Sequence, residues 1–228
     1  MYTSWTCPLP AGGTSDEIAL TFDQGRSNRL LVIPALFDEA NKMRRHTVEV
    51  MRRLDHSGID SFLPDLPGWN DSLAPLQNQT LDGWRAGIAA AMEEFQPSHV
   101  LTIRAGALLA PDGLPGWRHA PTGGKQALRA MLRARTIAAK EAEREETMDS
   151  LQALGRSEGI ELAGWQLGAE MFAALEEATP PESEVQAEVA QSLLGGGGLW
   201  LRAEPDEDPE QADAMAAIIA IALLGGDA

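Results

Sequence analysis

A charged residue stands where the sequence predicts a sharp turn from a strand into a helix. In SHVLTIRAGALLA (98–110), the apolar run 99–103 is typical of a buried strand, and small residues surround the turn after it. Ligands of open parallel sheets bind at the carboxyl ends of the strands, so Arg104 is predicted to lie at a binding edge. A guanidinium stays protonated and has no free lone pair, which excludes Arg104 as a nucleophile.

Recognition of an anion is the chemistry that this arginine and residues of two other segments favour. The candidate ligand-binding residues are Glu39, Asn41, Lys42, Arg44, Arg104, Lys125 and Gln126. If these residues converge, they form a cationic pocket for a carboxylate or a phosphate, because arginine offers a planar, two-pronged donor. The alternative is that Glu39 and Arg104 pair with each other and fill the site with a structural salt bridge.

Other signals for chemistry are weaker. A single cysteine, Cys7, excludes an internal disulfide framework and a cysteine-based metal cluster, and we expect neither a metal nor a cofactor. The stretch TGGK (122–125) differs from a nucleotide-binding loop because Gln126 replaces the required Ser or Thr. In PDLPGWNDS (64–72), the Asp65 turn is typical of a satisfied backbone bend, and Ser72 has no histidine partner in sequence order.

Alternating strand and helix patterns in the first half of the chain must position these residues. The predicted strands are 17–22, 29–34, 59–65 and 99–103, and the predicted helices are 38–58 and 81–95. This alternation predicts the α/β class, with a mostly parallel sheet and helices on both faces.

The second half is mainly helical in pattern. Residues 125–155 contain no proline and many strong helix formers, which predicts one long helix or two shorter ones. The other predicted elements are helices at 167–178 and 183–194, a strand at 199–204 and a closing helix within 205–224. We therefore expect a single domain over residues 1–228, in which residues 125–194 form a helical cap outside the sheet.

Charge is unevenly distributed along the chain. The 228 residues carry a formal net charge of −16, and residues 151–228 contain fifteen acidic and two basic side chains. Such a field repels a phosphate backbone, which argues against nucleic acid as a partner. The start of the chain lacks the pattern of a signal peptide, and the longest apolar stretch, 216–224, is shorter than the roughly 20 residues that span a bilayer. We expect a cytoplasmic protein without a membrane span.

Several blocks of the sequence carry a resemblance to a known family. PDLPGWNDS and TIRAGA resemble two loops of the α/β-hydrolase fold, the second being its nucleophile elbow, Gly-x-Ser-x-Gly. More narrowly, PALFDEANKMRR, IRAGALLA, APTGGKQALRAMLRAR and ELAGWQLGAEMFAALE resemble the exosortase A system-associated hydrolase-like proteins, over about residues 30–224. That family is encoded beside polysaccharide and protein-sorting genes in Gram-negative bacteria, and an arginine occupies its elbow too.

The resemblance implies a scaffold that lacks hydrolase chemistry. Arg104 takes the nucleophile position of the elbow, and the fold places its catalytic histidine last in chain order, whereas no histidine follows His119. We therefore expect a non-catalytic protein that binds an anionic small molecule or a partner of an exosortase and exopolysaccharide system. One alternative is a hydrolase or acyltransferase in which Glu39 or Asp65 activates water. Another is a structural subunit that docks through its acidic C-terminal third.

Overall fold

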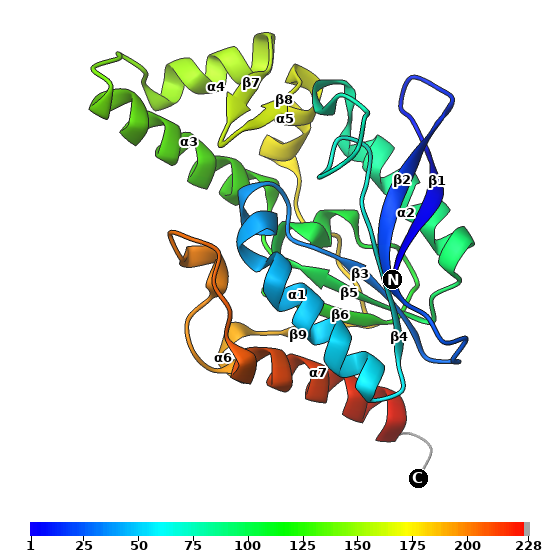
Figure 1. Cartoon of the computed structure of the whole chain (residues 1–228). Coiled ribbons are helices and arrows are strands. Elements are labelled where there is room, and N and C mark those ends of the chain that lie inside the picture. The colour runs from blue at the N-terminus through cyan, green and yellow to red at the C-terminus, as the bar shows by residue number, and fades with distance from the viewer. Residues whose placement is uncertain (226–228) are drawn as a thin grey trace.

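A seven-stranded sheet forms the centre of the computed structural model, which describes residues 1–225 (Figure 1). Its strands are β1 (Tyr2–Pro8), β2 (Thr14–Phe22), β3 (Arg29–Ile33), β4 (Asp60–Pro64), β5 (His99–Ile103), β6 (Gly116–His119) and β9 (Gln186–Val189). Their order across the sheet is β1-β2-β4-β3-β5-β6-β9. The first two pairings are antiparallel and the rest are parallel, so the carboxyl ends of β4, β3, β5, β6 and β9 meet at one edge.

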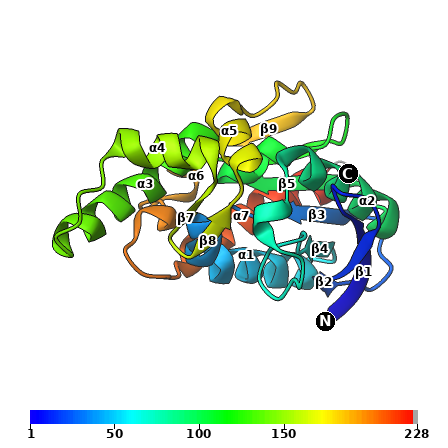
Figure 2. The same ribbon diagram turned by 90° about the horizontal axis from the view of Figure 1, so that it is seen from above.

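Helices cover both faces of this sheet (Figure 2). On one face α1 (Asp38–His56) packs beside α7 (Pro209–Leu224), and short α6 (Gln191–Leu194) contributes to the same apolar cluster. On the other face lie α2 (Leu81–Phe95) and the 3-10 helix η2 (Arg104–Leu109). The predicted α/β class is confirmed. None of the helices within residues 1–225 is both long enough and apolar enough to cross a membrane.

The segment between β6 and β9 adds helices outside the sheet. It contains α3 (Gly124–Glu141), α4 (Met148–Ser157), a hairpin of β7 (Ile160–Leu162) and β8 (Trp165–Leu167), and α5 (Ala169–Glu177). Residues 125–155 therefore form two helices, the second of the two predicted arrangements. The chain turns at Glu143, whose φ is 56°, and Thr147 begins α4 by accepting a hydrogen bond from the Ser150 amide at 3.1 Å. Both views show α3 and α4 side by side (Figures 1 and 2).

Two predicted elements are wrong. Residues 183–194 do not form one helix, because 186–189 pair in parallel with β6 as the edge strand β9, and only the short α6 follows. Residues 199–204 do not form a strand, because Leu199–Leu201 form a 3-10 helix, η3, after a run of glycines. In both places, long-range packing overrides the local preference of the sequence.

Two strands of the sheet have no counterpart among the predicted elements. β1 alternates between buried and exposed residues, with Trp5 and Cys7 facing the core, but polar residues between them dilute the apolar signal. β6 is four residues long and buries Arg118 and His119, so its composition does not predict a buried strand. The sequence therefore predicts the apolar middle of the sheet better than its edges.

Gly106, two residues into η2, gives the first test of this packing. A Cβ atom at this position would lie 2.2 Å from the carbonyl oxygen of Pro34 and 2.8 Å from that of Ile33. We expect Gly106→Ala to lower the free energy of unfolding by about 1–3 kcal/mol, because the turn must move away from β3. Urea denaturation would measure the change. The control is Gly197→Ala, where no atom lies within 4 Å, and its effect should stay below about 0.5 kcal/mol.

Candidate functional site

Arg104 lies at a strained turn between β5 and η2. Its φ is 53°, in the left-handed region that residues with a side chain rarely adopt. Such a conformation costs of order 1–3 kcal/mol and persists where the surrounding structure fixes it. Here Gly106 fixes the turn through its close approach to Pro34, and the Thr122 amide donates to the Arg104 carbonyl at 3.4 Å. The turn thus presents the side chain of residue 104 at the carboxyl edge of the sheet.

The guanidinium of Arg104 is engaged by protein groups. Its Nε donates to Oε2 of Glu39 at 3.0 Å, its Nη2 donates to Oε1 at 3.3 Å, and its Nη1 donates to the Ala120 carbonyl at 2.8 Å. One face of the group lies over Trp200, 4.1 Å from the ring centroid. The side chains of Arg104 and Glu39 are each 14% exposed. Of the two arrangements that the sequence left open, the structure contains the internal pair.

The other candidates on α1 turn toward different neighbours. Lys42 pairs with Asp38 at 2.8 Å, one helical turn before it. Arg44 reaches toward Asp65, with 3.8 Å between its Nη1 and the nearer carboxylate oxygen. Asn41 lines an open hollow beside the β7–β8 hairpin. The helical phase of α1 therefore spreads these side chains instead of gathering them around Arg104.

The two candidates on α3 form no hydrogen bond or ion pair with Glu39 or Arg104. Lys125 and Gln126 occupy the first turn of that helix, which carries no acidic residue, and both are exposed. Lys125 lines a hollow between α3 and α4. Among residues 1–225, Glu39 and Arg104 are the two members of the predicted set that form an ion pair with each other.

A buried layer of aromatic rings lies behind the guanidinium. The ring of His119, at the end of β6, is 5.8 Å from that of Trp200, and the ring of His46, on α1, is 6.4 Å from His119. His119 Nδ1 lies 3.2 Å from the Val189 carbonyl oxygen, and His46 Nδ1 has no hydrogen-bond partner. Burial lowers the pKa of His119 and lowers that of His46 from 6.5 to about 4. Sequence order gave no reason to place either histidine near the elbow.

The loop after β4 is held by buried polar groups. Asp65 accepts a hydrogen bond from Asn70 Nδ2 at 2.5 Å, and burial raises the pKa of its carboxyl group. The Ser72 hydroxyl donates to Glu17 at 2.9 Å and accepts from the Gly68 amide at 2.9 Å. Ser72 therefore closes the loop, and its hydroxyl is already committed to structural bonds.

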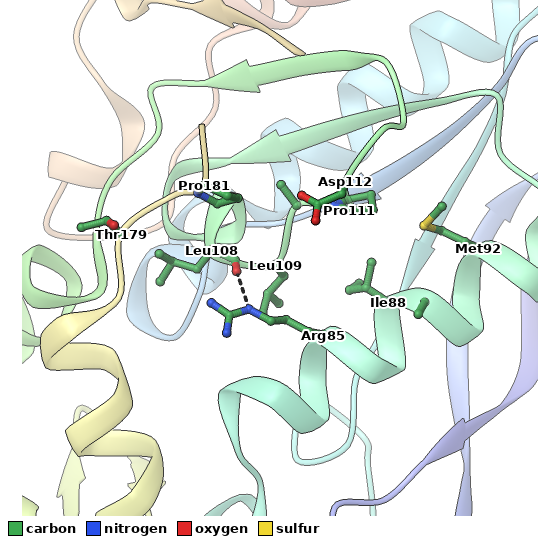
Figure 3. Close-up of a pocket in the computed structure, with 11 residues that line it drawn as sticks. Arg85, Ile88, Met92, Leu108, Leu109, Pro111, Asp112, Thr179 and Pro181 are labelled. Atoms are coloured by element: carbon green, nitrogen blue, oxygen red, sulfur yellow. Dashed lines mark hydrogen bonds between the residues drawn. The ribbon is translucent and has the colours of Figure 1, made fainter. Parts of the chain in front are cut away.

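Two cavities flank this part of the molecule. A small one beside Asn70 is lined by Phe37, Trp69 and Trp165, and its volume of about 20 Å³ admits roughly one water molecule. A larger one of about 440 Å³ lies between α2 and the end of η2 (Figure 3). Arg85 at its rim donates from Nε to the Leu108 carbonyl at 3.1 Å. None of the seven candidate residues lines this larger cavity.

Residues 1–225 also show no group of three or more side chains arranged to hold a metal ion.

Comparison with known proteins identifies the architecture. No protein-family model matches the chain, and no curated protein sequence matches it significantly. Mouse alpha/beta hydrolase domain-containing protein 10 superposes with a TM-score of 0.58 at 12% identity, over 99% of this chain and 100% of that one. Est1E from Butyrivibrio proteoclasticus, solved with ferulic acid, superposes with a TM-score of 0.56 at 11% identity, over 97% and 98%.

The chain has the α/β-hydrolase fold. Hydrolases of this fold carry a serine at the strained turn between strand and helix, in the motif Gly-x-Ser-x-Gly. In this chain the residue with left-handed backbone at the turn after β5 is Arg104, and Thr102 and Gly106 stand two residues before and after it. The turn after β5 therefore has a strained backbone and carries an arginine side chain.

Removal of the arginine tests how much the fold depends on the pair. We expect Arg104→Met to lower the free energy of unfolding by about 1–3 kcal/mol, because Glu39 is left poorly solvated without its partner. Adding Glu39→Gln should recover part of the loss in a double-mutant cycle. The control is Arg52→Met, because the Arg52 side chain is 57% exposed and its partner Glu49 keeps a second pair with Arg53; its effect should be below about 1 kcal/mol. Equal losses in Arg104→Met and Arg52→Met would contradict a structural role for the elbow pair.

The buried histidines predict a dependence of stability on acidity. The pKa of His46 is about 4 in the folded chain and near 6.5 when unfolded, so the unfolded state binds the proton more tightly between these values. The contribution of His46 to the unfolding free energy should therefore decrease by up to about 1.4 kcal/mol for each pH unit between about pH 6.5 and pH 4, and it should change little below that range. Urea denaturation across this range should show a shallower decrease for His46→Leu than for the unmodified chain. His56→Leu, at an exposed position, should leave the slope unchanged.

Proposed function

We propose that this chain is a non-catalytic binding protein built on the α/β-hydrolase fold. The observation that carries the proposal is Arg104 itself: it occupies the nucleophile position in the strained conformation of an elbow, with its guanidinium bound by Glu39 and the Ala120 carbonyl. Such a group has no electron pair to donate to a substrate carbonyl. An acyl-enzyme route has no starting point at this turn.

The second component of hydrolase chemistry is a base, and the histidines do not supply it at this site. His119 and His46 lie behind Trp200, and burial disfavours their protonated forms. A catalytic histidine must exchange a proton with the nucleophile through a direct hydrogen bond. With Arg104 at the nucleophile position, these rings have no such partner at the elbow.

An anionic small molecule is the class of ligand that we assign to this binding function. The candidate residues are predominantly cationic or amide-bearing, and among them Lys125 forms no salt bridge with any residue in the range 1–225. The resemblance to exosortase-associated proteins places the ligand or partner, in this proposal, in a polysaccharide or protein-sorting system, with the protein acting in the cytoplasm. In this proposal the ion pair of Glu39 and Arg104 has a structural role.

A second candidate function rests on Asp65. Its carboxyl group is buried, its pKa is raised, and Asn70 orients it at the carboxyl end of β4. A buried carboxylate with a raised pKa is a stronger base than an exposed one and is suited to activating water. This alternative makes the chain a hydrolase without a covalent intermediate.

An esterase screen separates the two functions. We expect purified protein to hydrolyse short-chain acyl esters and thioesters no faster than Asp65→Asn or Glu39→Gln variants do. Asp82→Asn is the matched control, because Asp82 lies on the exposed side of α2 and is 89% exposed. Turnover that Asp65→Asn abolishes and Asp82→Asn preserves would establish the carboxylate hydrolase and overturn the non-catalytic proposal.

A further inference from the structure

One face of α3 carries a row of cations that no carboxylate neutralises. Lys125, Arg129 and Arg133 follow one another at intervals of four residues, so they lie on the same side of the helix, and all three are exposed. Their side chains form no salt bridge and no hydrogen bond with any of residues 1–225. We call these three residues the α3 basic row.

Acidic side chains outnumber basic ones by 34 to 18, and twelve of the 18 basic side chains form a salt bridge within residues 1–225. Arg135, on the same helix, pairs with Glu146 through two hydrogen bonds of 2.9 Å each. Arg53, on α1, is paired with both Glu49 and Asp213. Carboxylates therefore pair with other arginines of the chain, whereas the three side chains of the α3 basic row have no acidic partner within residues 1–225.

The carboxylate that lines the hollow beside the row is paired with another arginine. Glu176, on α5, lines the same hollow as the row, yet both of its oxygens accept hydrogen bonds from Arg156, at 2.6 and 2.8 Å. The first turn of α3 also contains no acidic residue, so the positive end of the helix dipole adds to the charge of Lys125. The hollow is therefore lined by three cations without a salt bridge within residues 1–225 and by one carboxylate that is already paired.

The row borders a hollow with an apolar floor. This hollow lies between α3 and α4 and has a volume of about 280 Å³. Leu128 and Leu132 from α3 and Met148 from α4 provide its apolar lining, and Gln152 adds an amide. Cationic heads along one wall and aliphatic side chains below them match a molecule that is charged at one end and apolar along its length.

We propose that the hollow between α3 and α4 binds an anionic amphiphile. A carboxylate or phosphate head group would accept hydrogen bonds from Arg129 and Arg133, which stand one helical turn apart, and Lys125 would add a third charge. The aliphatic chain would lie against Leu128, Leu132 and Met148. This inference rests on the proposed binding function and gives it a ligand class and a location.

Alternative anions fit the hollow less well. A nucleic acid would bring its repeated charges against a chain whose net charge is −16, which disfavours its approach. Inorganic phosphate would satisfy the cations but leave the apolar lining in water. The combination of charge and apolar surface favours a single head group attached to a hydrocarbon chain.

Isothermal titration of the full chain with dodecanoate and with dodecyl phosphate, both below their micelle concentrations, tests the proposal. We expect at least one of them to bind, and the stronger of the two identifies the head group. The double variant Arg129→Gln and Arg133→Gln should weaken this binding about tenfold or more, because it removes two charge-assisted donors. Inorganic phosphate should bind at least tenfold more weakly than the amphiphile.

A charge-matched control separates a built site from general attraction. Arg45→Gln with Arg52→Gln removes the same charge from exposed positions on α1, and it should leave the affinity within about twofold. Thermal melting of both double variants establishes that they are folded. No binding of either amphiphile, or equal weakening by the two double variants, would overturn the α3–α4 site. Ester hydrolysis in the earlier screen, with amphiphile binding intact, would instead overturn the non-catalytic function alone.

Discussion

The contact between Glu39 and Arg104 links segments that are distant in the sequence. Glu39 belongs to the first turn of α1, Arg104 to the turn after β5, Ala120 to the loop after β6, and Trp200 to η3 near the end of the chain. All four meet around one guanidinium at the carboxyl edge of the sheet. An arginine suits this position because its planar group offers five donors on its edge and an apolar face for stacking. The donors of this guanidinium are directed at groups of the protein itself.

The sequence predicted the parts of the fold in which local pattern and tertiary environment agree. The central strands β3 and β5 are short apolar runs buried on both faces, and α1 and α2 bury periodic apolar residues. The prediction was wrong where pairing between distant segments determines the secondary structure. The segment QAEV of β9 has the composition of a helix and becomes a strand because β6 presents an open edge to it. The composition of residues 186–189 does not indicate that an unpaired strand edge is available to them.

The candidate site was predictable in one respect and unpredictable in another. Arg104 could be placed at the elbow because a strand pattern precedes it and small residues follow it, and the backbone adopts the strained turn. The grouping of the other candidates could not be read from spacing along the chain. Lys42 has Asp38 one turn away on its own helix, and Arg44 points toward Asp65 in another loop. Lysine and arginine side chains are long and flexible. The partner of each one therefore depends on distances that are fixed only when the chain is folded.

The left-handed backbone at residue 104 has a consequence for how such a protein can change over time. A serine at this turn would inherit the geometry of a nucleophile, but it would leave the Glu39 carboxylate without a cation and would find no histidine in the last part of the chain to accept its proton. Arg104→Ser alone would therefore remove the partner of a carboxylate that is only 14% exposed without adding a proton acceptor. The strained turn and the carboxylate it faces are therefore coupled, and a change at residue 104 must be matched by a change at residue 39.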